Sequence, residues 1–308
     1  MIEVRNLCKN YGPTVSLDNV SFSAPQGEVV GFLGPNGAGK STTMKVLMGL
    51  ARPTSGAATI GGVDVQKDHQ RVHKMVGYLP EQAPVYGDMT LASFLEFMGG
   101  IKGLSGRDAK KEMLRTTDLV NLQRERPRLL RNLSKGTRQR AGIAQALLGD
   151  PPVLLLDEPT AGLDPSQIND VRELVKSLAG RRTVLVSTHI LPEVELTCTR
   201  IVIIAAGRVV AEGTPRELVA TEESEFIVAV RGSKETFAEA IRGVTGMDNL
   251  KFEQSGDQLT ARLKPAPAIA TRAKLARRIV ELGLDLVEMR EAHGRLEDIC
   301  LRAVGKRP

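Results

Sequence analysis

Short apolar runs alternate with longer amphipathic segments over residues 1–215. Val29–Leu33 is an apolar run that leads into a glycine-rich turn, and apolar residues then recur on one face of the helical segment Lys40–Leu50. Val153–Leu156 and Thr183–Ser187 are continuous apolar runs, typical of parallel strands that are covered on both faces. This alternation predicts an α/β domain over residues 1–215.

Two regions depart from this pattern. Residues of about 90–145 are more polar and helical, carry a run of basic residues, and predict a helical insertion in the α/β domain. After Pro215 a charged segment precedes weakly alternating and helical stretches, which predict a small α+β accessory domain over residues 216–308. Its expected elements are Phe226–Arg231, Lys234–Ile241, a hairpin of Leu250–Gln254 and Gln258–Leu263 around Gly256-Asp257, Ala268–Leu282, Leu284–Met289 and Leu296–Ala303.

Composition narrows the possible functions. Hydrophobic residues make up 42% and charged residues 25%, which is typical of a globular protein. No apolar run approaches the roughly 18 residues needed to cross a bilayer, so we expect a cytoplasmic chain that reaches a membrane only through a partner. The net charge of +6 leaves several partners open, but 3% aromatic residues and no Trp argue against a base-stacking surface, and we expect no nucleic acid. The three cysteines lack metal or disulfide spacing.

A phosphate-binding loop is the strongest motif. The segment Gly34–Thr42 fits G-x-x-x-x-G-K-[ST] and lies between a predicted strand and a predicted helix. Glycines let main-chain N–H groups approach a triphosphate closely, and the following helix directs its positive end toward it. We expect Lys40 to reach the β and γ oxygens of ATP and Ser41 to ligate Mg²⁺. The nucleotide-binding set is Gly34, Asn36, Gly37, Ala38, Gly39, Lys40, Ser41 and Thr42.

A second motif supplies two acids. The apolar run Val153–Leu156 ends in Asp157 and Glu158, and adjacent residues at a strand end point to different sides. One carboxylate can therefore serve the metal and the other the attacking water. We assign Asp157 to Mg²⁺ and Glu158 to the general base.

Taken together, the motifs resemble those of the ATP-binding subunits of ABC transporters over residues 1–215. Leu133–Thr137 resembles the signature loop of that family, in which Ser134 can also cap the following helix. Pro159–Pro165 resembles the D-loop and Ser187-Thr188-His189 the switch histidine. The implied fold is a P-loop NTPase of ABC type with a helical subdomain.

The resemblance also implies a mechanism and further site residues. Each ATP would lie between the phosphate loop of one copy and the signature loop of a second copy, with Ser134 and Gly136 on the γ-phosphate. Asp164 would couple the two sites, and His189 would contact the γ-phosphate and the attacking water. Tyr11 lies where the family places an aromatic ring that stacks on adenine.

Two departures from the family pattern affect these assignments. The signature is Ser-Lys-Gly-Thr rather than Ser-Gly-Gly-Gln, although Ser134 and Gly136 remain. Near the Q-loop, Glu81 takes the place of the usual glutamine and Gln82 follows it. Either residue is a candidate to sense Mg²⁺ and water, and Glu81 is slightly favoured.

The segments Gly77–Glu81 and Thr188–Glu195 resemble an exporter-like subgroup that works with a separate transmembrane permease. The expected location is therefore the inner face of the cell membrane, with the permease and a second ATP-binding subunit as partners. The alternatives are a soluble ABC ATPase of translation or DNA repair and a mechanical coupler without transported substrate. The first is disfavoured because the chain has one phosphate loop and no sustained heptads.

Overall fold

The structure is a computed structural model that describes residues 1–82, 86–220, 225–247, 250, 252–263, 267–292, 296–297 and 299. The chain divides into two compact units, Met1–Pro215 and Arg216–Ile299. No helix in the described part of the chain is long and apolar enough to span a bilayer.

The first unit contains a central sheet of six strands in the order β10-β9-β3-β8-β7-β6. All neighbouring pairs are parallel except the edge pair of β9 and β10. Both faces of β3, β7 and β8 are buried, which is why their sequences are continuous apolar runs. The strands are β3 (Val29–Leu33), β6 (Val76–Leu79), β7 (Val153–Asp157), β8 (Thr183–Thr188), β9 (Arg200–Ala205) and β10 (Arg208–Gly213).

A second, antiparallel sheet packs against the same core in the order β2-β1-β4-β5. Side chains of both sheets share this core, where the rings of Phe22 on β2 and Phe32 on β3 lie 5.0 Å apart. The strands are β1 (Ile2–Tyr11), β2 (Thr14–Ala24), β4 (Ser55–Ile60) and β5 (Val63–Asp64).

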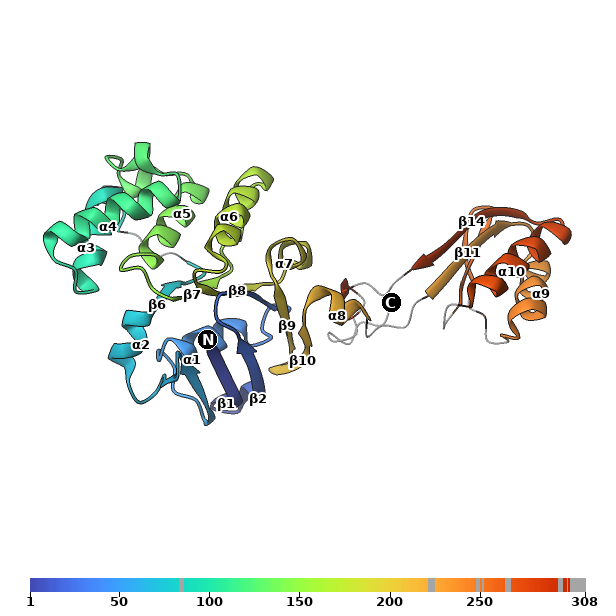
Figure 1. Cartoon of the computed structure of the whole chain (residues 1–308), viewed down its shortest axis with the longest axis horizontal. Helices are drawn as coiled ribbons and strands as arrows, with labels where there is room; N and C mark the ends of the chain where they lie inside the picture. The colour runs from blue at the N-terminus through green and yellow to red at the C-terminus, as the bar shows by residue number, and fades with distance from the viewer. Residues whose placement is uncertain are drawn as a thin grey trace. The chain divides into compact units, whose positions relative to one another are not determined.

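Helices flank the central sheet, and three of them form the helical insertion beside β6 and β7 (Figure 1). The insertion consists of α3 (Leu91–Ile101), α4 (Gly106–Leu119) and α5 (Lys135–Ala146), with 3-10 turns at Gln123–Glu125 and Leu130–Asn132. Thr90, Ser105 and Ser134 cap the three helices by accepting a main-chain N–H. The other helices are α1 (Lys40–Leu47), α2 (His69–Met75), α6 (Pro165–Leu178) and α7 (Leu191–Thr197), and α8 (Pro215–Ala220) follows β10 in the chain.

The second unit is a βαββαβ module. Its sheet has the order β12-β13-β11-β14, and all three pairs are antiparallel, which is the ferredoxin-like arrangement. Helices α9 and α10 pack together on one face, over a core that includes Phe237, Leu275 and Val228. The elements are β11 (Glu225–Arg231), α9 (Lys234–Thr245), β12 (Phe252–Ser255), β13 (Gln258–Leu263), α10 (Ile269–Glu281) and β14 (Asp285–Ala292).

Most predicted elements occur, with shifts at their ends. The helix after the phosphate loop was predicted to end at Leu50, but it ends at Leu47. Gly49, two residues later, adopts φ +69°. The antiparallel sheet of β1, β2, β4 and β5 has no counterpart among the predicted elements. Register shifts between Val4 and Asn10 interrupt the alternation of buried and exposed residues that would reveal β1. The expected helix Leu296–Ala303 lies largely outside the described residues.

Candidate functional site

The loop between β3 and α1 can be built only with glycine at particular positions. At Gly34 a side chain would place its Cβ 2.2 Å from the main-chain oxygen of Ile204. Gly39 adopts φ +107°, and a Cβ there would lie 2.8 Å from the oxygen of Ser16. The loop therefore closes tightly onto its neighbours and turns directly into α1 at Lys40.

The Lys40 ammonium is held inside this loop, where the residue is 6% exposed. Its Nζ donates to the main-chain oxygens of Gly34, at 2.8 Å, and Pro35, at 3.2 Å. It also lies 3.3 Å from Oε1 of Glu158. A buried cation with these partners is positioned before any phosphate is bound.

The two predicted acids lie at the end of β7, beside the end of β8. Asp157 is 2% exposed, and the hydroxyl of Ser187 donates to its Oδ1. Glu158 has φ +47°, a left-handed conformation that costs a non-glycine residue about 1–2 kcal/mol. Its N–H donates to both the main-chain oxygen and the hydroxyl of Ser187, each at 3.1 Å. This strained turn leaves the Glu158 carboxylate beside Lys40, whereas that of Asp157 is bound by Ser187.

His189 completes this group from the segment after β8. Its Nδ1 lies 3.0 Å from Oε2 of Glu158, and its side chain is 45% exposed. The two oxygens of Glu158 are therefore divided between Lys40 and His189. A carboxylate, an imidazole and an ammonium are thus joined by one ion pair and one hydrogen bond.

These residues line a cavity of about 350 Å³. Glu81 and Gln82 are both exposed, but only Glu81 lies on its wall. The wall also includes Ser16, whose hydroxyl donates to that of Thr42 at 2.9 Å. The lining residues are Ser16, Asn36, Gly37, Gly39, Lys40, Ser41, Thr42, Glu81, Glu158, Ala161 and His189.

The chain matches the family model described as "ABC transporter" over residues 17–161. It is 33% identical to the Nod factor export ATP-binding protein I of Ralstonia nicotianae, a match that covers 99% of this chain and 94% of the relative. The chain belongs to the ABC transporter ATP-binding proteins. The linearmycin resistance ATP-binding protein LnrL of Bacillus subtilis is 35% identical over 82% of this chain and 83% of its own length.

A solved structure supports the same assignment. The ATP-binding cassette MJ0796, in a dimeric post-hydrolysis state with ADP and Pi, aligns with a TM-score of 0.63 and 28% identity over 70% of this chain and 98% of its own. The α/β fold and the ATPase activity predicted from the sequence are confirmed. The chain is an ATP-binding and ATP-hydrolysing subunit of the transporter type, and the alternative of a soluble ATPase of translation or DNA repair is not supported.

Besides Gly34, Ala38, Asp157 and Gln82, four further predicted residues of this ATP-binding subunit do not line the cavity in the single chain. Ser134 caps α5 by accepting the N–H of Thr137. Gly136 packs so closely on Gln167 of α6 that a Cβ would lie 2.2 Å from its side-chain oxygen. The other two are Asp164, at the start of α6, and Tyr11, 49% exposed on β1.

The structure also shows how two of these residues are held. Hydrogen bonds from the side chain of Ser166 and the main chain of Gln167 keep the pKa of the Asp164 carboxyl below its usual value. The ammonium of Lys9 lies 4.6 Å from the centre of the Tyr11 ring. A cation therefore covers the ring at the position where adenine stacking was predicted.

Three residues near the cavity were given no role by motif analysis, although Ala161 and Ser187 lie within the quoted motifs. Ser16 and Ala161 lie on its wall, and Ser187 holds the main chain at Glu158. Ser16 comes from β2, and only the packing of the antiparallel sheet brings it to the phosphate loop. Ser187 directly precedes the Thr188-His189 pair in the sequence, and in the central sheet it lies opposite Asp157, between β7 and β8.

Proposed function

We propose that the cavity holds the triphosphate of ATP, with Lys40 and the main chain of the phosphate loop as its ligands. Glu158 acts as general base toward the attacking water, and His189 contacts that water and the γ-phosphate. The observation that supports these roles is the convergence of Lys40, Glu158 and His189 on one cavity beside a glycine-built loop.

We further propose that Mg²⁺ is bound by the hydroxyl of Ser41 and, through water, by Asp157. These are oxygen donors, which Mg²⁺ prefers, and the described residues contain no cluster of three or more His, Cys, Asp or Glu that would form an all-protein metal cage. Both features fit a metal that shares its coordination with phosphate and water. When bound, the ion would neutralise negative charge on the phosphate oxygens. Of the two Q-loop candidates, Glu81 is favoured over Gln82 because it lies on the cavity wall.

A second ATP-binding subunit, we propose, completes each site. Ser134 and Gly136 contact the γ-phosphate held by the other copy, and Asp164 couples the two sites. Ser134 and Asp164 are exposed at the starts of α5 and α6, where main-chain N–H groups favour anions and polar partners. The dimeric state reported for MJ0796 is consistent with this arrangement.

The helical insertion carries a patch suited to a membrane partner. Tyr86, Phe97 and Ile101 are 55%, 46% and 62% exposed, and the rings of Tyr86 and Phe97 meet edge to face at 5.8 Å. Exposed apolar side chains grouped in this way indicate a protein contact. We propose that this patch docks on a transmembrane permease and holds the subunit at the inner face of the membrane. Export is the proposed direction, as named for the Nod factor relative.

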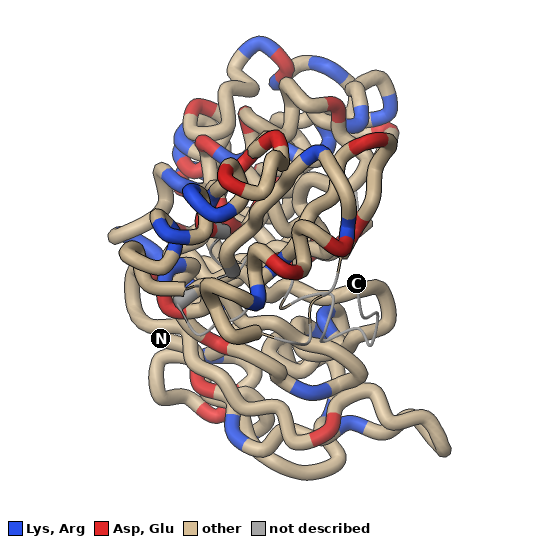
Figure 2. The backbone as a smooth tube through the Cα atoms, turned by 90° about the vertical axis from the view of Figure 1, so that its right-hand side faces the viewer, with Lys and Arg blue, Asp and Glu red and all other residues tan. Residues whose placement is uncertain are grey.

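The basic run of the insertion gives less support to a lipid contact. Arg126 and Arg128 pair with Asp118 and Glu125, and Arg131 pairs with Asp88 at 2.5 Å. Over the chain as a whole, blue and red segments are interspersed in Figure 2. Arginine side chains paired in this way attract anionic lipid weakly.

Two measurements test the proposed function. Calorimetry with Mg-ATP should show binding by the wild-type chain and a loss of affinity of at least about tenfold in Lys40→Ala, because the phosphate loses its buried cation. Unchanged binding in Lys40→Ala would contradict the assignment of the cavity.

For the membrane partner, Phe97→Asp should move the tagged chain from membranes to the soluble fraction of its host without loss of ATP binding. Leu50→Asp, a control that alters a residue 63% exposed elsewhere in the same unit, should leave it on membranes.

A further inference from the structure

A buried carboxylate lies near the catalytic group but outside the wall of the ATP cavity. Glu193 belongs to the first turn of α7 and is 9% exposed. Burying a carboxylate is costly unless hydrogen bonds or charges compensate it. The partners of Glu193 therefore indicate what this side chain does.

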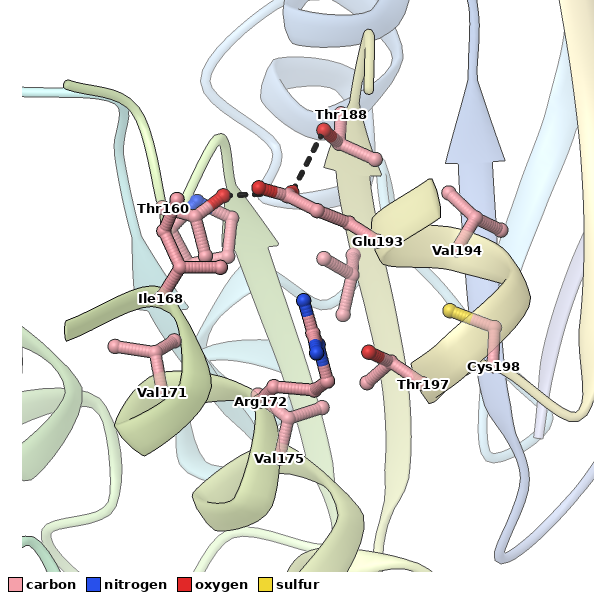
Figure 3. Close-up of a pocket in the computed structure, with 12 residues that line it drawn as sticks. Thr160, Ile168, Val171, Arg172, Val175, Thr188, Glu193, Val194, Thr197 and Cys198 are labelled. Carbon is pink, nitrogen blue, oxygen red and sulfur yellow. Dashed lines mark hydrogen bonds between the residues drawn. The ribbon is translucent and has the colours of Figure 1, made fainter. Parts of the chain in front are cut away.

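One oxygen of Glu193 joins two segments of the site (Figure 3). Its Oε2 accepts the hydroxyl of Thr160 at 2.7 Å and the hydroxyl of Thr188 at 3.1 Å. Thr160 lies two residues after Glu158, at the start of the D-loop segment, and Thr188 directly precedes His189. The hydroxyl of Thr188 also accepts the N–H of Ile190 at 3.1 Å, which fixes the main chain on the far side of His189.

The second oxygen faces α6. Neither Oε1 of Glu193 nor Nε of Arg172 has a hydrogen-bond partner within the described ranges, although both atoms are buried. Both side chains border a cavity of about 20 Å³ between α6 and α7, and in Figure 3 the Arg172 guanidinium extends toward the Glu193 carboxylate. That volume accommodates one water molecule, which would satisfy both atoms.

We propose that Glu193 is a positioning residue for ATP hydrolysis. Its carboxylate sets the spacing between Thr160 and Thr188, and through them the relative positions of the Glu158 and His189 side chains. A water shared with Arg172 extends the link to α6, the helix that begins at Asp164. The proposal rests on the ATP site proposed above and adds a residue that does not touch ATP.

A purely structural role predicts different behaviour. If Glu193 only anchored α7, replacing it would lower stability and reduce ATP binding and turnover together through loss of folded protein. If it positions Glu158 against His189, its loss lowers kcat while ATP affinity persists, because Lys40 and the phosphate loop do not depend on the threonine link. Displacements of about 1 Å at a reacting group change rates by up to about 100-fold.

The test compares Glu193→Leu with the conservative Glu193→Gln, with ATP affinity, kcat and thermal unfolding measured for each. We expect Glu193→Leu to lower kcat by about 10-fold to 100-fold with ATP affinity within about twofold. Glu193→Gln keeps an oxygen that accepts both hydroxyls, so we expect it to restore most of kcat. Glu195→Leu, on the exposed side of the same helix, is the matched control and should hydrolyse ATP at the wild-type rate.

The Thr160→Val variant examines the same link with little change of shape, and it serves if Glu193→Leu does not fold. Its loss of kcat should not add to that of Glu193→Leu in the double variant, because both changes break one link. Wild-type kcat in Glu193→Leu or in Thr160→Val, or losses that add fully, would overturn the positioning role. A wild-type chain that fails to hydrolyse ATP would instead count against the proposed site itself.

Discussion

Replacing Glu158 by Gln separates binding of ATP from its cleavage. Glutamine keeps the size of the side chain and can occupy the same strained main-chain conformation at φ +47°. The amide cannot accept a proton from water, so the contribution of a general base is lost, about 10²- to 10⁴-fold in kcat. This corresponds to about 3–5 kcal/mol in the activation free energy.

Binding should respond in the opposite direction. In the wild-type chain the Glu158 carboxylate lies 3.3 Å from the Lys40 ammonium and competes with phosphate for it. The variant removes that negative charge, and Lys40 keeps its two main-chain acceptors in the loop. We therefore expect ATP affinity to be equal to or tighter than in the wild type, and a dimer that persists with ATP.

Single-turnover hydrolysis, calorimetry with Mg-ATP and light scattering measure the three quantities. Glu173→Gln, which changes an exposed acid on α6, is the control and should match the wild type in all of them. Turnover of Glu158→Gln within about tenfold of wild type would refute the base assignment. So would a variant that loses ATP affinity while its kcat stays unchanged.

Two further predictions concern buried groups outside the site. Burial lowers the pKa of Lys102 to about 8, against the opposing effect of Glu112, while its ammonium donates to main-chain oxygens at the end of α5. Above about pH 8 the unfolded chain therefore holds more protons than the folded chain. The free energy of unfolding of the wild type should rise by about 1 kcal/mol per pH unit from pH 8 to 9.5, relative to that of Lys102→Met. Equal pH dependence of the wild type and Lys102→Met in denaturant titrations would contradict this. Burial, followed by the charge of Glu193, raises the pKa of the Cys198 thiol to about 12, so only about one part in 10⁴ is thiolate at pH 8. Peptide-resolved alkylation should label half-buried Cys8 well before Cys198 in the native chain, and equal rates would show that the α7 region opens freely.

The sequence predicted the parts of the fold whose pattern is local. Buried parallel strands appear as apolar runs, and the hairpin at Gly256-Asp257 follows from a glycine that adopts φ +61° between two alternating segments. The antiparallel sheet was not predicted because register shifts in β1 break the alternation of its residues. Ser16 was not predicted as a site residue, because its proximity to Thr42 is a consequence of how that sheet packs.

The same distinction applies to the site. The phosphate loop and the acid pair are contiguous, so their residue types and spacing carry the chemical meaning. The link from Thr160 through Glu193 to Thr188 joins three segments, and no one of them contains a motif that requires the others. Glu193 follows His189 by about one helical turn. Any short helix after β8 could place an acid at that spacing, so the spacing alone does not indicate a role. Its role became visible only when both hydroxyl partners were located.

The position of Glu193 affects how the ATP sites of two copies would be coupled. Ser134 and Gly136 do not reach the ATP cavity of their own chain, so a phosphate contact from them requires a neighbouring copy. Asp164 starts α6 four residues after Thr160, and its side chain is fixed by main-chain N–H groups of that helix. A shift of α6 on pairing would therefore act on Thr160 from one side, while Glu193 holds the other side to the His189 segment. Under the proposed mechanism, the spacing between Glu158 and His189 therefore depends on whether a second copy is present. Replacing Glu193 should weaken this dependence on pairing before it weakens ATP binding.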